Sequence, residues 1–444
     1  MMNNTKVDIQ ASRFSGAQSN RTLKHPLLPQ PTENDEIQHV NRIANIKDSK
    51  DSFAEVFCRP CTPNRQSDEP ADLIEEHEHA SHTEIDCHSE QHTFVVCADS
   101  QLGMTSLNKE WETELHYCRL AVDKINSINP RPKFVCICGD LVDMENSFYY
   151  NNPNALKSYE LEECEEIQRK QFYDFKDTFG KLHPDIAIVC LCGNHDIGTL
   201  YLHMIRLISI RNLSFFNFFS LANVSSQITL AGNRPTQASI QKFRNEFGDE
   251  YLAFWANGTY NIVLNNVLFT NPDGAEQMFI EQLHWLEERL EYANDHQAAQ
   301  IYVFSHHPWF LYHEEEDHDD FVPGAGSSFP REWDDGSGKF DGAIFPDEYF
   351  SVPKKYRKMA MDLFKDYNVN ACFSGHFHQN LVSKASFGMD MIITGPLSMV
   401  FDSNGKPNQT EGNGRGVRVI EVSVDTKNQA VGAGKFTHHF ESIE

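Results

Sequence analysis

Long apolar runs are missing from this sequence. Nowhere in its 444 residues do roughly 18 apolar residues follow one another, and Met1 to Ala11 contain no apolar core of signal-peptide length. No internal repeat is visible, and nothing indicates a second folded domain. We therefore expect a cytoplasmic protein with no membrane-spanning segment.

Basic residues are scarce relative to acidic ones. The chain has 38 lysines and arginines against 64 aspartates and glutamates, which gives a formal charge of −26. This balance argues against nucleic acid and anionic membranes as partners, because both attract basic surfaces.

The 11 cysteines do not suggest a disulfide framework. Six of them lie in apolar, strand-like runs, where cysteine is typical of a small buried hydrophobic residue. This pattern agrees with a cytoplasmic location. The six are Cys97, Cys136, Cys138, Cys190, Cys192 and Cys372.

Residues 1–90 are polar, lack hydrophobic periodicity and contain several prolines, so we predict a disordered tail. The tail holds one alternative. Cys58 and Cys61, followed by His79 and His82, loosely suggest a small zinc site. Their spacing departs from the usual finger pattern, and no apolar residues support a fold there.

Residues 91–444 form the predicted enzyme domain, in which short apolar runs alternate with helix-like segments. This alternation predicts an α/β domain with a mixed sheet. The predicted strands are 94–98, 134–138, 186–192, 262–269, 301–304, 371–373, 391–394 and 417–424. The predicted helices lie near 109–128, 161–179, 236–247, 276–293 and 353–367.

Polar side chains follow many of the predicted strands. In α/β sheets, ligands bind beyond the carboxyl ends of the strands, so we expect these side chains to gather at one edge. They are Asp99, Asp140, Asn194, His306 and His376.

Two short motifs provide candidate oxygen ligands for metal ions. Asp99 and Gln101 stand two residues apart, so that both can reach one ion. In the second motif, Gly139 permits a sharp turn, and the carboxylate of Asp140 can bridge two cations. We interpret Asp143, which follows closely, as a turn residue.

The string Gly193-Asn194-His195-Asp196 is more specific. Asn194 offers a neutral oxygen ligand, and His195 is predicted to point toward a substrate. Asp196 is predicted to hold the imidazole of His195 in its protonated, oriented form. The alternative for the whole string is an ordinary polar turn between a strand and a helix.

Histidines mark the last two motifs. His306 follows a buried strand and stands two residues before Pro308, which makes it a better ligand than its neighbour His307. His307 remains a possible alternative ligand. His376 and His378 stand two residues apart in a turn, so they can serve two adjacent metal ions.

In order and form, the five motifs resemble those of the calcineurin-like metallophosphoesterase family, over roughly residues 93–440. The resemblance implies a central β-sandwich of mixed sheets flanked by helices, in four layers (α/β/β/α). A closer similarity is to the calcineurin-like phosphoesterase domain-containing protein 1 group, which is regarded as a group of serine/threonine protein phosphatases. This similarity rests on residues 98–103, 129–134, 193–198, 247–251 and 304–310.

The resemblance also implies two divalent metal ions (manganese, iron, zinc or magnesium) and a hydroxide between them that attacks the phosphate. His195 would sit beside that phosphate. The first ion would be held by Asp99, Gln101, Asp140 and His378. The second would be held by Asp140, Asn194, His306 and His376, with Asp140 bridging.

Gln101 departs from the wider family, most of which has histidine at this position, although the closer group shares the glutamine. An amide oxygen binds transition metals more weakly than imidazole does. The first ion is therefore predicted to be labile, or to be manganese or magnesium in preference to zinc.

Two segments stand apart from the motifs. Residues 199–232 form an atypical hydrophobic insertion, interpreted either as a lid beside His195 or as translated intron sequence from an imperfect gene model. Residues 313–320 form an acidic run, which either repels polyanionic substrates or is an ordinary solvated loop.

The motifs predict a phosphomonoesterase acting on phosphorylated proteins. Two alternatives remain: a phosphodiesterase or nucleotide-cleaving enzyme with the same metal core, and a non-catalytic scaffold on the same fold. The absence of an obvious nucleotide cradle favours the monoesterase, and the presence of His195 argues against the scaffold.

Overall fold

The computed structural model describes residues 89–144, 159–199, 234–316, 329–331, 343–345, 350–401, 407–408, 414–425 and 434–443. These residues all belong to one compact unit, His39–Glu444. The predicted polar tail, with its alternative zinc site, and the predicted insertion lie outside the described residues, except for Ser89, Glu90 and Thr199.

The first sheet contains the strands that precede three of the predicted motifs. Its strand order is β17-β16-β1-β2-β3, with β1, β2 and β3 parallel and the other two strands antiparallel. The strand between β1 and β3, Phe134–Cys138, has all five residues buried, as expected for a strand covered on both faces. The bounds are β1 Ser89–Cys97, β2 Phe134–Cys138, β3 Ala187–Leu191, β16 Gly416–Asp425 and β17 Lys435–Ser442.

The second sheet contains the strands that precede the two histidine motifs. Its order is β12-β13-β11-β8-β7-β6, in which the four inner strands are parallel and the two edge strands are antiparallel. The bounds are β6 Leu252–Ala256, β7 Thr259–Val263, β8 Gln300–Phe304, β11 Ala371–Ser374, β12 Leu381–Lys384 and β13 Asp390–Ile393.

Aromatic side chains join the two sheets face to face. The ring of Phe94 on β1 stacks on Phe134 of β2 at 4.7 Å and meets Phe304 of β8 and Phe373 of β11 edge-on at 5.8 and 5.7 Å. All four side chains are fully buried. Burial of these rings is a large favourable term, because each removes 150–250 Å² of mostly apolar surface from water.

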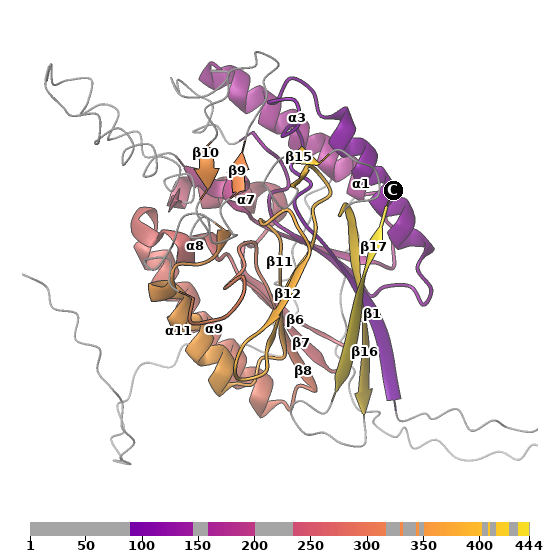
Figure 1. Cartoon of the computed structure of the whole chain (residues 1–444), viewed down its shortest axis with the longest axis vertical. Coiled ribbons are helices and arrows are strands. Elements are labelled where there is room, and N and C mark those ends of the chain that lie inside the picture. Colours follow the sequence, from indigo (N-terminus) through magenta and orange to yellow (C-terminus); the bar gives the residue numbers. More distant parts are fainter. Residues whose placement is uncertain are drawn as a thin grey trace, which may run out of the picture. The chain divides into compact units, whose positions relative to one another are not determined.

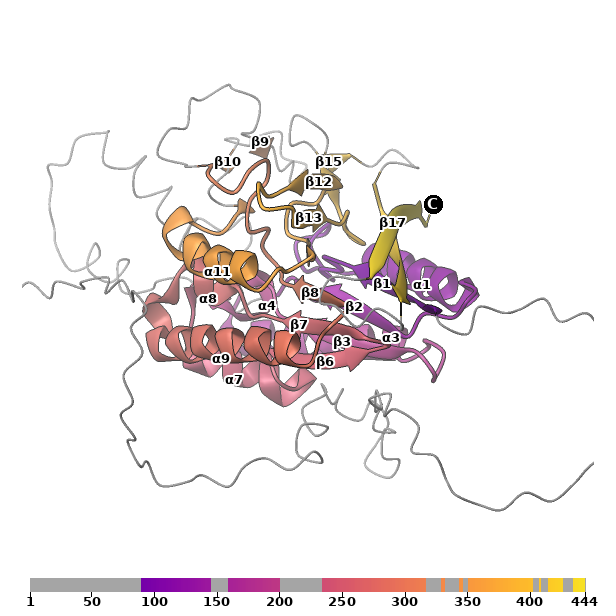
Figure 2. The ribbon, with the colours of Figure 1, turned by 90° about the horizontal axis from the view of Figure 1, so that it is seen from below.

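Helices cover the outer faces of the sandwich (Figures 1 and 2). Their bounds are α1 Glu112–Ser127, α3 Leu161–Phe179, α4 Asn194–Ile197, α7 Gln237–Phe247, α8 Val267–Thr270, α9 Glu276–Asp295 and α11 Lys354–Asp366. In Figures 1 and 2, helices α1 and α3 lie beside the first sheet, and α8, α9 and α11 lie beside the second. Shorter elements are β4 Gly198–Thr199, β5 Arg234–Pro235, η2 Pro272–Gly274, β9 Phe329–Arg331, β10 Ala343–Phe345, β14 Val400–Phe401 and β15 Pro407–Asn408.

The predicted α/β architecture is confirmed, but one predicted strand is wrong. Residues 262–269 form the end of β7, a turn and the helix α8. The apolar run is interrupted by Asn265 and Asn266, which are both fully buried. The Asn265 backbone N–H donates to Gln282 Oε1, and Asn266 Nδ2 donates to the carbonyl oxygen of His307, so both bonds lie outside a strand ladder. The turn that they form carries part of the site described below.

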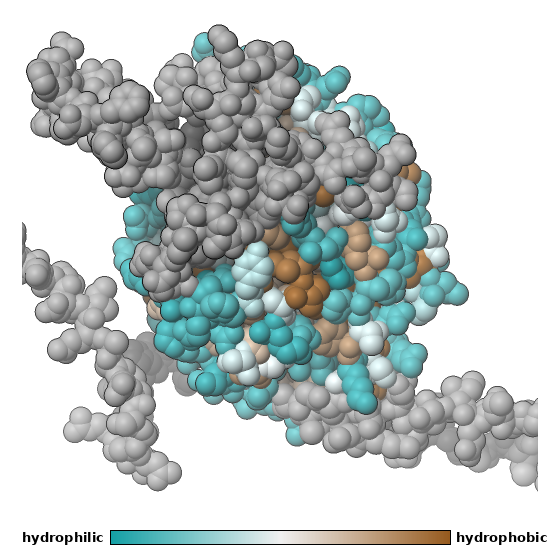
Figure 3. Space-filling view, in the orientation of Figure 1, coloured by the Kyte–Doolittle hydropathy of each residue, from teal (hydrophilic) through white to brown (hydrophobic). Residues whose placement is uncertain are grey.

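Large exposed apolar side chains are scattered among the described residues. The described surface in the orientation of Figure 1 is mostly hydrophilic, with small apolar areas between the hydrophilic ones (Figure 3). No helix in the described ranges is long and apolar enough to cross a membrane.

Candidate metal centre

The predicted ligands lie where the parallel strands of both sheets end. Asp99, Asp140 and Asn194 follow β1, β2 and β3 of the first sheet, while His306 and His376 follow β8 and β11 of the second. None of these five side chains is more than 3% exposed. The structure therefore brings the polar strand ends together in a buried position between the two sheets.

Four ligand atoms surround one position suited to a cation. His306 Nε2 lies 3.0 Å from Asn194 Oδ1, 3.1 Å from His376 Nδ1 and 3.3 Å from Asp140 Oδ2. Neighbouring ligands on an ion with bonds of about 2.1 Å are separated by about 3 Å, so the spacing fits a bound metal. His306 Nδ1 faces the carbonyl oxygen of Cys138 at 2.8 Å, and a proton on that nitrogen leaves Nε2 as the donor to a metal.

The atoms around His306 Nε2 belong to the ligand set predicted for the second ion. The set predicted for the first ion lies next to it, because ligand atoms of Asp99, Asp140 and His306 lie within 4.8 Å of one another. His378 is oriented in the same way as His306, with Nδ1 2.5 Å from the carbonyl oxygen of Met399 and Nε2 3.6 Å from Asp99 Oδ1. Gln101 Oε1 is buried and has no hydrogen-bond partner in the described part of the chain. A buried oxygen without a donor is costly unless a cation binds it, so this set also fits a metal ion.

The backbone at the site is held in an unusual conformation. Five of the predicted ligands have a positive backbone φ. Residues other than glycine rarely adopt this conformation, which costs about 1–3 kcal/mol for each residue. Such conformations cluster at functional sites because the surrounding structure has to impose them. The angles are 51° for Asp99, 38° for Gln101, 49° for Asp140, 64° for His376 and 55° for His378.

Glycines in three of the motifs leave room for the ligand side chains. A Cβ on Gly193 would lie 2.1 Å from Asp140 Oδ1, and a Cβ on Gly375 would lie 2.4 Å from Asp99 Oδ2. A Cβ on Gly139 would lie 2.6 Å from His306 Nδ1. The glycines are therefore required by close approach to the ligands as well as by turn geometry.

Charges within the site affect one another strongly. Burial raises the pKa of Asp99 to about 8. Burial would also raise the pKa of Asp140, but the nearby His306 and His195 outweigh it and hold that pKa below its usual range. Two buried carboxylates side by side create a strong demand for positive charge, which divalent cations would satisfy.

His195 lies at the edge of the site, with 16% of its side chain exposed. Its backbone N–H donates to Asp140 Oδ1 at 2.8 Å, and its ring Nδ1 lies 3.1 Å from Asp143 Oδ1. Burial lowers the pKa of His195, but Asp140 and Asp143 outweigh that effect and raise it to about 9. The two carboxylates therefore favour the protonated form of the imidazole.

The predicted role of Asp196 is wrong. Its carboxylate accepts hydrogen bonds from the backbone N–H groups of Gly193 (2.8 Å), Leu141 (3.0 Å) and Val142 (3.4 Å), which fixes the loops after β2 and β3. The carboxylate that pairs with the His195 ring is Asp143, which the sequence analysis interprets as a turn residue.

Asp143 is in turn fixed by a chain of buried amides. Asn108 Nδ2 donates to Asp143 Oδ2 at 2.7 Å, and Gln171 Nε2 on α3 donates to Asn108 Oδ1 at 2.6 Å. The side-chain oxygen Oε1 of Gln171 accepts the backbone N–H of Met144 at 3.1 Å. The only sequence signal for this arrangement was the short distance along the chain between Asp140 and Asp143.

His307 and Asn266 also belong to the site. Asn266 Oδ1 accepts the backbone N–H groups of both His306 and His307 at 3.1 Å, and its Nδ2 donates to the His307 carbonyl oxygen at 2.7 Å. Sequence reasoning missed Asn266 because it falls inside the run that was predicted as a strand.

The acidic run is described only for 313–316, where Glu316 accepts the N–H groups of Leu311 and Tyr312.

The family of the chain follows from comparison with known proteins. A sequence model described as calcineurin-like phosphoesterase matches residues 92–380, a span that includes all the motifs. The chain belongs to this family. Membership confirms the predicted fold of two mixed sheets flanked by helices, and it makes the protein a metallophosphoesterase with a buried cluster of histidines and aspartates able to bind metal.

Curated relatives within the calcineurin-like phosphoesterases cover most of the chain. The serine/threonine-protein phosphatase CPPED1 of Danio rerio is 26% identical over 339 residues, which cover 74% of this chain and 81% of the relative. The protein of the same name from Homo sapiens is 25% identical over 360 residues, which cover 79% and 83%. The predicted resemblance to this group is thereby confirmed as a distant homology.

Solved structures of phosphatases resemble the chain more loosely. A dimetal phosphatase from Danio rerio has 13% identity and a TM-score of 0.40, and the aligned region covers 78% of this chain and 98% of the phosphatase chain. A purple acid phosphatase from yellow lupin seeds has 10% identity and a TM-score of 0.39, and covers 78% and 53%.

Proposed function

We propose that the protein hydrolyses phosphate monoesters and that its substrates are proteins phosphorylated on serine or threonine. The observation that carries the proposal is the pair of buried ligand sets that share Asp140, with the His195 ring beside them and paired with Asp143. The choice of substrate is supported by the curated relatives, whose name is serine/threonine-protein phosphatase.

Each ligand set would hold one divalent cation. When bound, the two ions supply Lewis-acid activation of a water molecule and offset charge on the phosphate oxygens. The first position would be held by Asp99, Gln101, Asp140 and His378, and the second by Asp140, Asn194, His306 and His376.

The side chains of this protein contribute orientation and a proton. The bond from Asp143 to Nδ1 of His195 directs the opposite nitrogen, Nε2, away from Asp143. From that nitrogen His195 would donate a proton to the leaving oxygen of the substrate. The neutral hydroxyl of serine or threonine is a much better leaving group than the alkoxide, so this proton transfer is the protein's direct contribution to bond cleavage.

The proposal is tested by comparing p-nitrophenyl phosphate, bis-p-nitrophenyl phosphate and a phosphoserine peptide as substrates. Metal-depleted protein is assayed after addition of manganese, magnesium or zinc. We expect metal-dependent hydrolysis of the monoester and the peptide, lost in Asp140→Asn and kept in Asp185→Asn, whose carboxylate is exposed and pairs with Arg131. Preference for the diester would instead identify a phosphodiesterase, and inactivity with every metal would favour a scaffold.

A further inference from the structure

His307 is a buried histidine that neither ligand set uses. Its side chain is fully buried, and neither Nδ1 nor Nε2 has a hydrogen-bond partner in the described part of the chain. A buried polar group without a partner loses its hydration and gains nothing in return. The ring therefore calls for an explanation in the groups that surround it.

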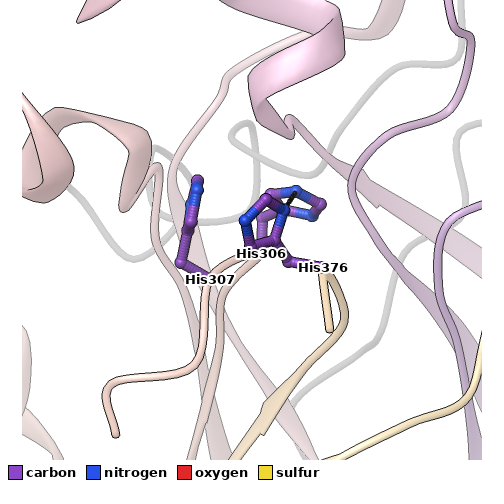
Figure 4. Close-up of side chains that lie close together, drawn as sticks. All are labelled: His306, His307 and His376. Carbon is purple, nitrogen blue, oxygen red and sulfur yellow. Dashed lines mark hydrogen bonds between the residues drawn. The ribbon is translucent and has the colours of Figure 1, made fainter. Parts of the chain in front are cut away.

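The ring of His307 stands beside those of His306 and His376 (Figure 4). The ring centroids lie 4.9 Å from His306 and 4.1 Å from His376. One ring nitrogen from each of the three residues lies within 4.8 Å of the other two. Because His306 and His376 face the second metal position, a ring nitrogen of His307 lies close to that position as well.

The backbone beneath His307 is fixed, so its ring can occupy only a small region. Asn266 holds the N–H and the carbonyl oxygen of His307 by hydrogen bonds of 3.1 and 2.7 Å, and the N–H of His306 by another of 3.1 Å. Side-chain rotation alone decides whether a ring nitrogen of His307 faces the ion.

Packing against His376 is the simpler explanation of this ring. The two rings are tilted by 49°, which is an acceptable aromatic contact. Phenylalanine would make the same contact without two unsatisfied nitrogens, as Phe350 does on His376 at 5.8 Å. Packing explains the ring but not the two nitrogens.

We propose that His307 is a further ligand of the second metal ion, which then binds three imidazoles in addition to Asn194 and Asp140. The inference rests on the metal centre of the proposed function and is independent of the substrate. It makes the two metal positions chemically unequal. The second becomes rich in nitrogen and suited to zinc or iron, while the first is mainly oxygen and suited to manganese or magnesium.

The test compares unmutated protein with His307→Phe, which keeps the ring contact and removes the nitrogens. His92→Phe is a matched control, because His92 is also buried with two unpartnered nitrogens but lies on β1 roughly 20 Å from Asp99. Each metal-depleted protein is titrated with cobalt, followed by visible absorption, and with zinc against a chromophoric chelator.

We expect His307→Phe to weaken zinc binding at the second position by about 10-fold or more and to change the cobalt bands. His92→Phe should leave both unchanged. Zinc X-ray absorption of the unmutated protein at one equivalent should detect three imidazoles.

Two imidazoles, or a folded His307→Phe with unchanged affinity and cobalt bands, would overturn the inference and leave the metal centre intact. Failure of the unmutated protein to bind any metal would overturn the metal centre itself, and with it the proposed function.

Discussion

At the scale of residues, the metal ligands stand in short motifs, while the groups that orient them and His195 come from other parts of the chain. Asp99, Asp140 and His306 stand in short motifs whose chemistry is visible along the chain, and the structure brings them together. Asp143 and Asn266 act through contacts with residues remote in sequence, such as the Asn108 amide. Sequence proximity pointed instead to Asp196, whose side chain binds the backbone.

The role of His195 is tested by replacing it with alanine. We expect turnover to fall by roughly 10²-fold or more, because proton transfer to the leaving oxygen is lost. Metal content should stay unchanged, since the His195 ring contacts Asp143 and is not among the ligand sets. Inductively coupled plasma mass spectrometry together with kcat separates the two effects, and parallel loss of metal would make His195 a ligand instead.

The pairing of His195 with Asp143 predicts a change in pH dependence. Asp140 and Asp143 raise the pKa of His195 to about 9 against the effect of burial. Removing one negative charge in Asp143→Asn lowers that pKa, so the protonated form disappears at a lower pH. The alkaline limb of the kcat profile should therefore move down by about one pH unit.

Asp177→Asn is the control for this experiment, because the Asp177 carboxylate is exposed and pairs with Lys181 on the surface. Its pH profile should match that of the unmutated protein. An alkaline limb that stays in place in Asp143→Asn would show that another group controls it.

At the scale of elements, the site depends on how each strand ends. Strand β2 and helix α3 match their predicted bounds, because one is a continuous apolar run and the other has a regular amphipathic pattern. Strand β17 was not predicted, since it is an edge strand without a continuous apolar run: exposed polar residues alternate with half-buried ones such as Phe436 and Phe440. Residues 262–269 were predicted as one strand because apolar composition alone does not reveal a turn made by two buried asparagines.

The glycine after β3 is expected to be essential for metal binding. Gly193→Ala would place a Cβ 2.1 Å from Asp140 Oδ1, and the carboxylate would have to leave its position. The φ of Gly193 is −107°, which alanine adopts easily, so the clash with Asp140, and not backbone strain, should cause the loss of metal. We expect loss of bound metal in a protein that remains folded, measured by metal analysis and circular dichroism.

Gly388→Ala provides the contrasting control. Gly388 has φ of 103° and nothing within 4 Å of an added Cβ. Alanine there should cost about 1–3 kcal/mol of stability through backbone strain and leave metal content unchanged. Equal metal loss in both variants would show that strain, and not the clash with Asp140, controls the site.

At the scale of the whole molecule, the two ligand sets join the two sheets. Asp140 comes from the first sheet and His306 and His376 come from the second, so an ion bound to all three links the layers. The meeting of strand ends at one edge was predictable from the general rule for α/β sheets. The face-to-face arrangement of two sheets was not predictable from periodicity, and was expected only from the family resemblance.

This arrangement predicts that metal ions stabilise the fold. An ion that binds only the folded state at 100 times its Kd adds about 2.7 kcal/mol to the free energy of unfolding. Chelation should therefore lower the Tm by several degrees, and manganese or zinc should restore it. Asp140→Asn should not respond to added metal, whereas a response equal to that of the unmutated protein would place the stabilising ion elsewhere.

The central claim is that strand ends from both sheets build one two-metal site around Asp140. Anomalous diffraction from crystals soaked in manganese and zinc together tests it most directly. We expect two peaks about 3.5–4 Å apart, one on either side of the Asp140 carboxylate. A single peak, or peaks that do not share Asp140, would contradict the account.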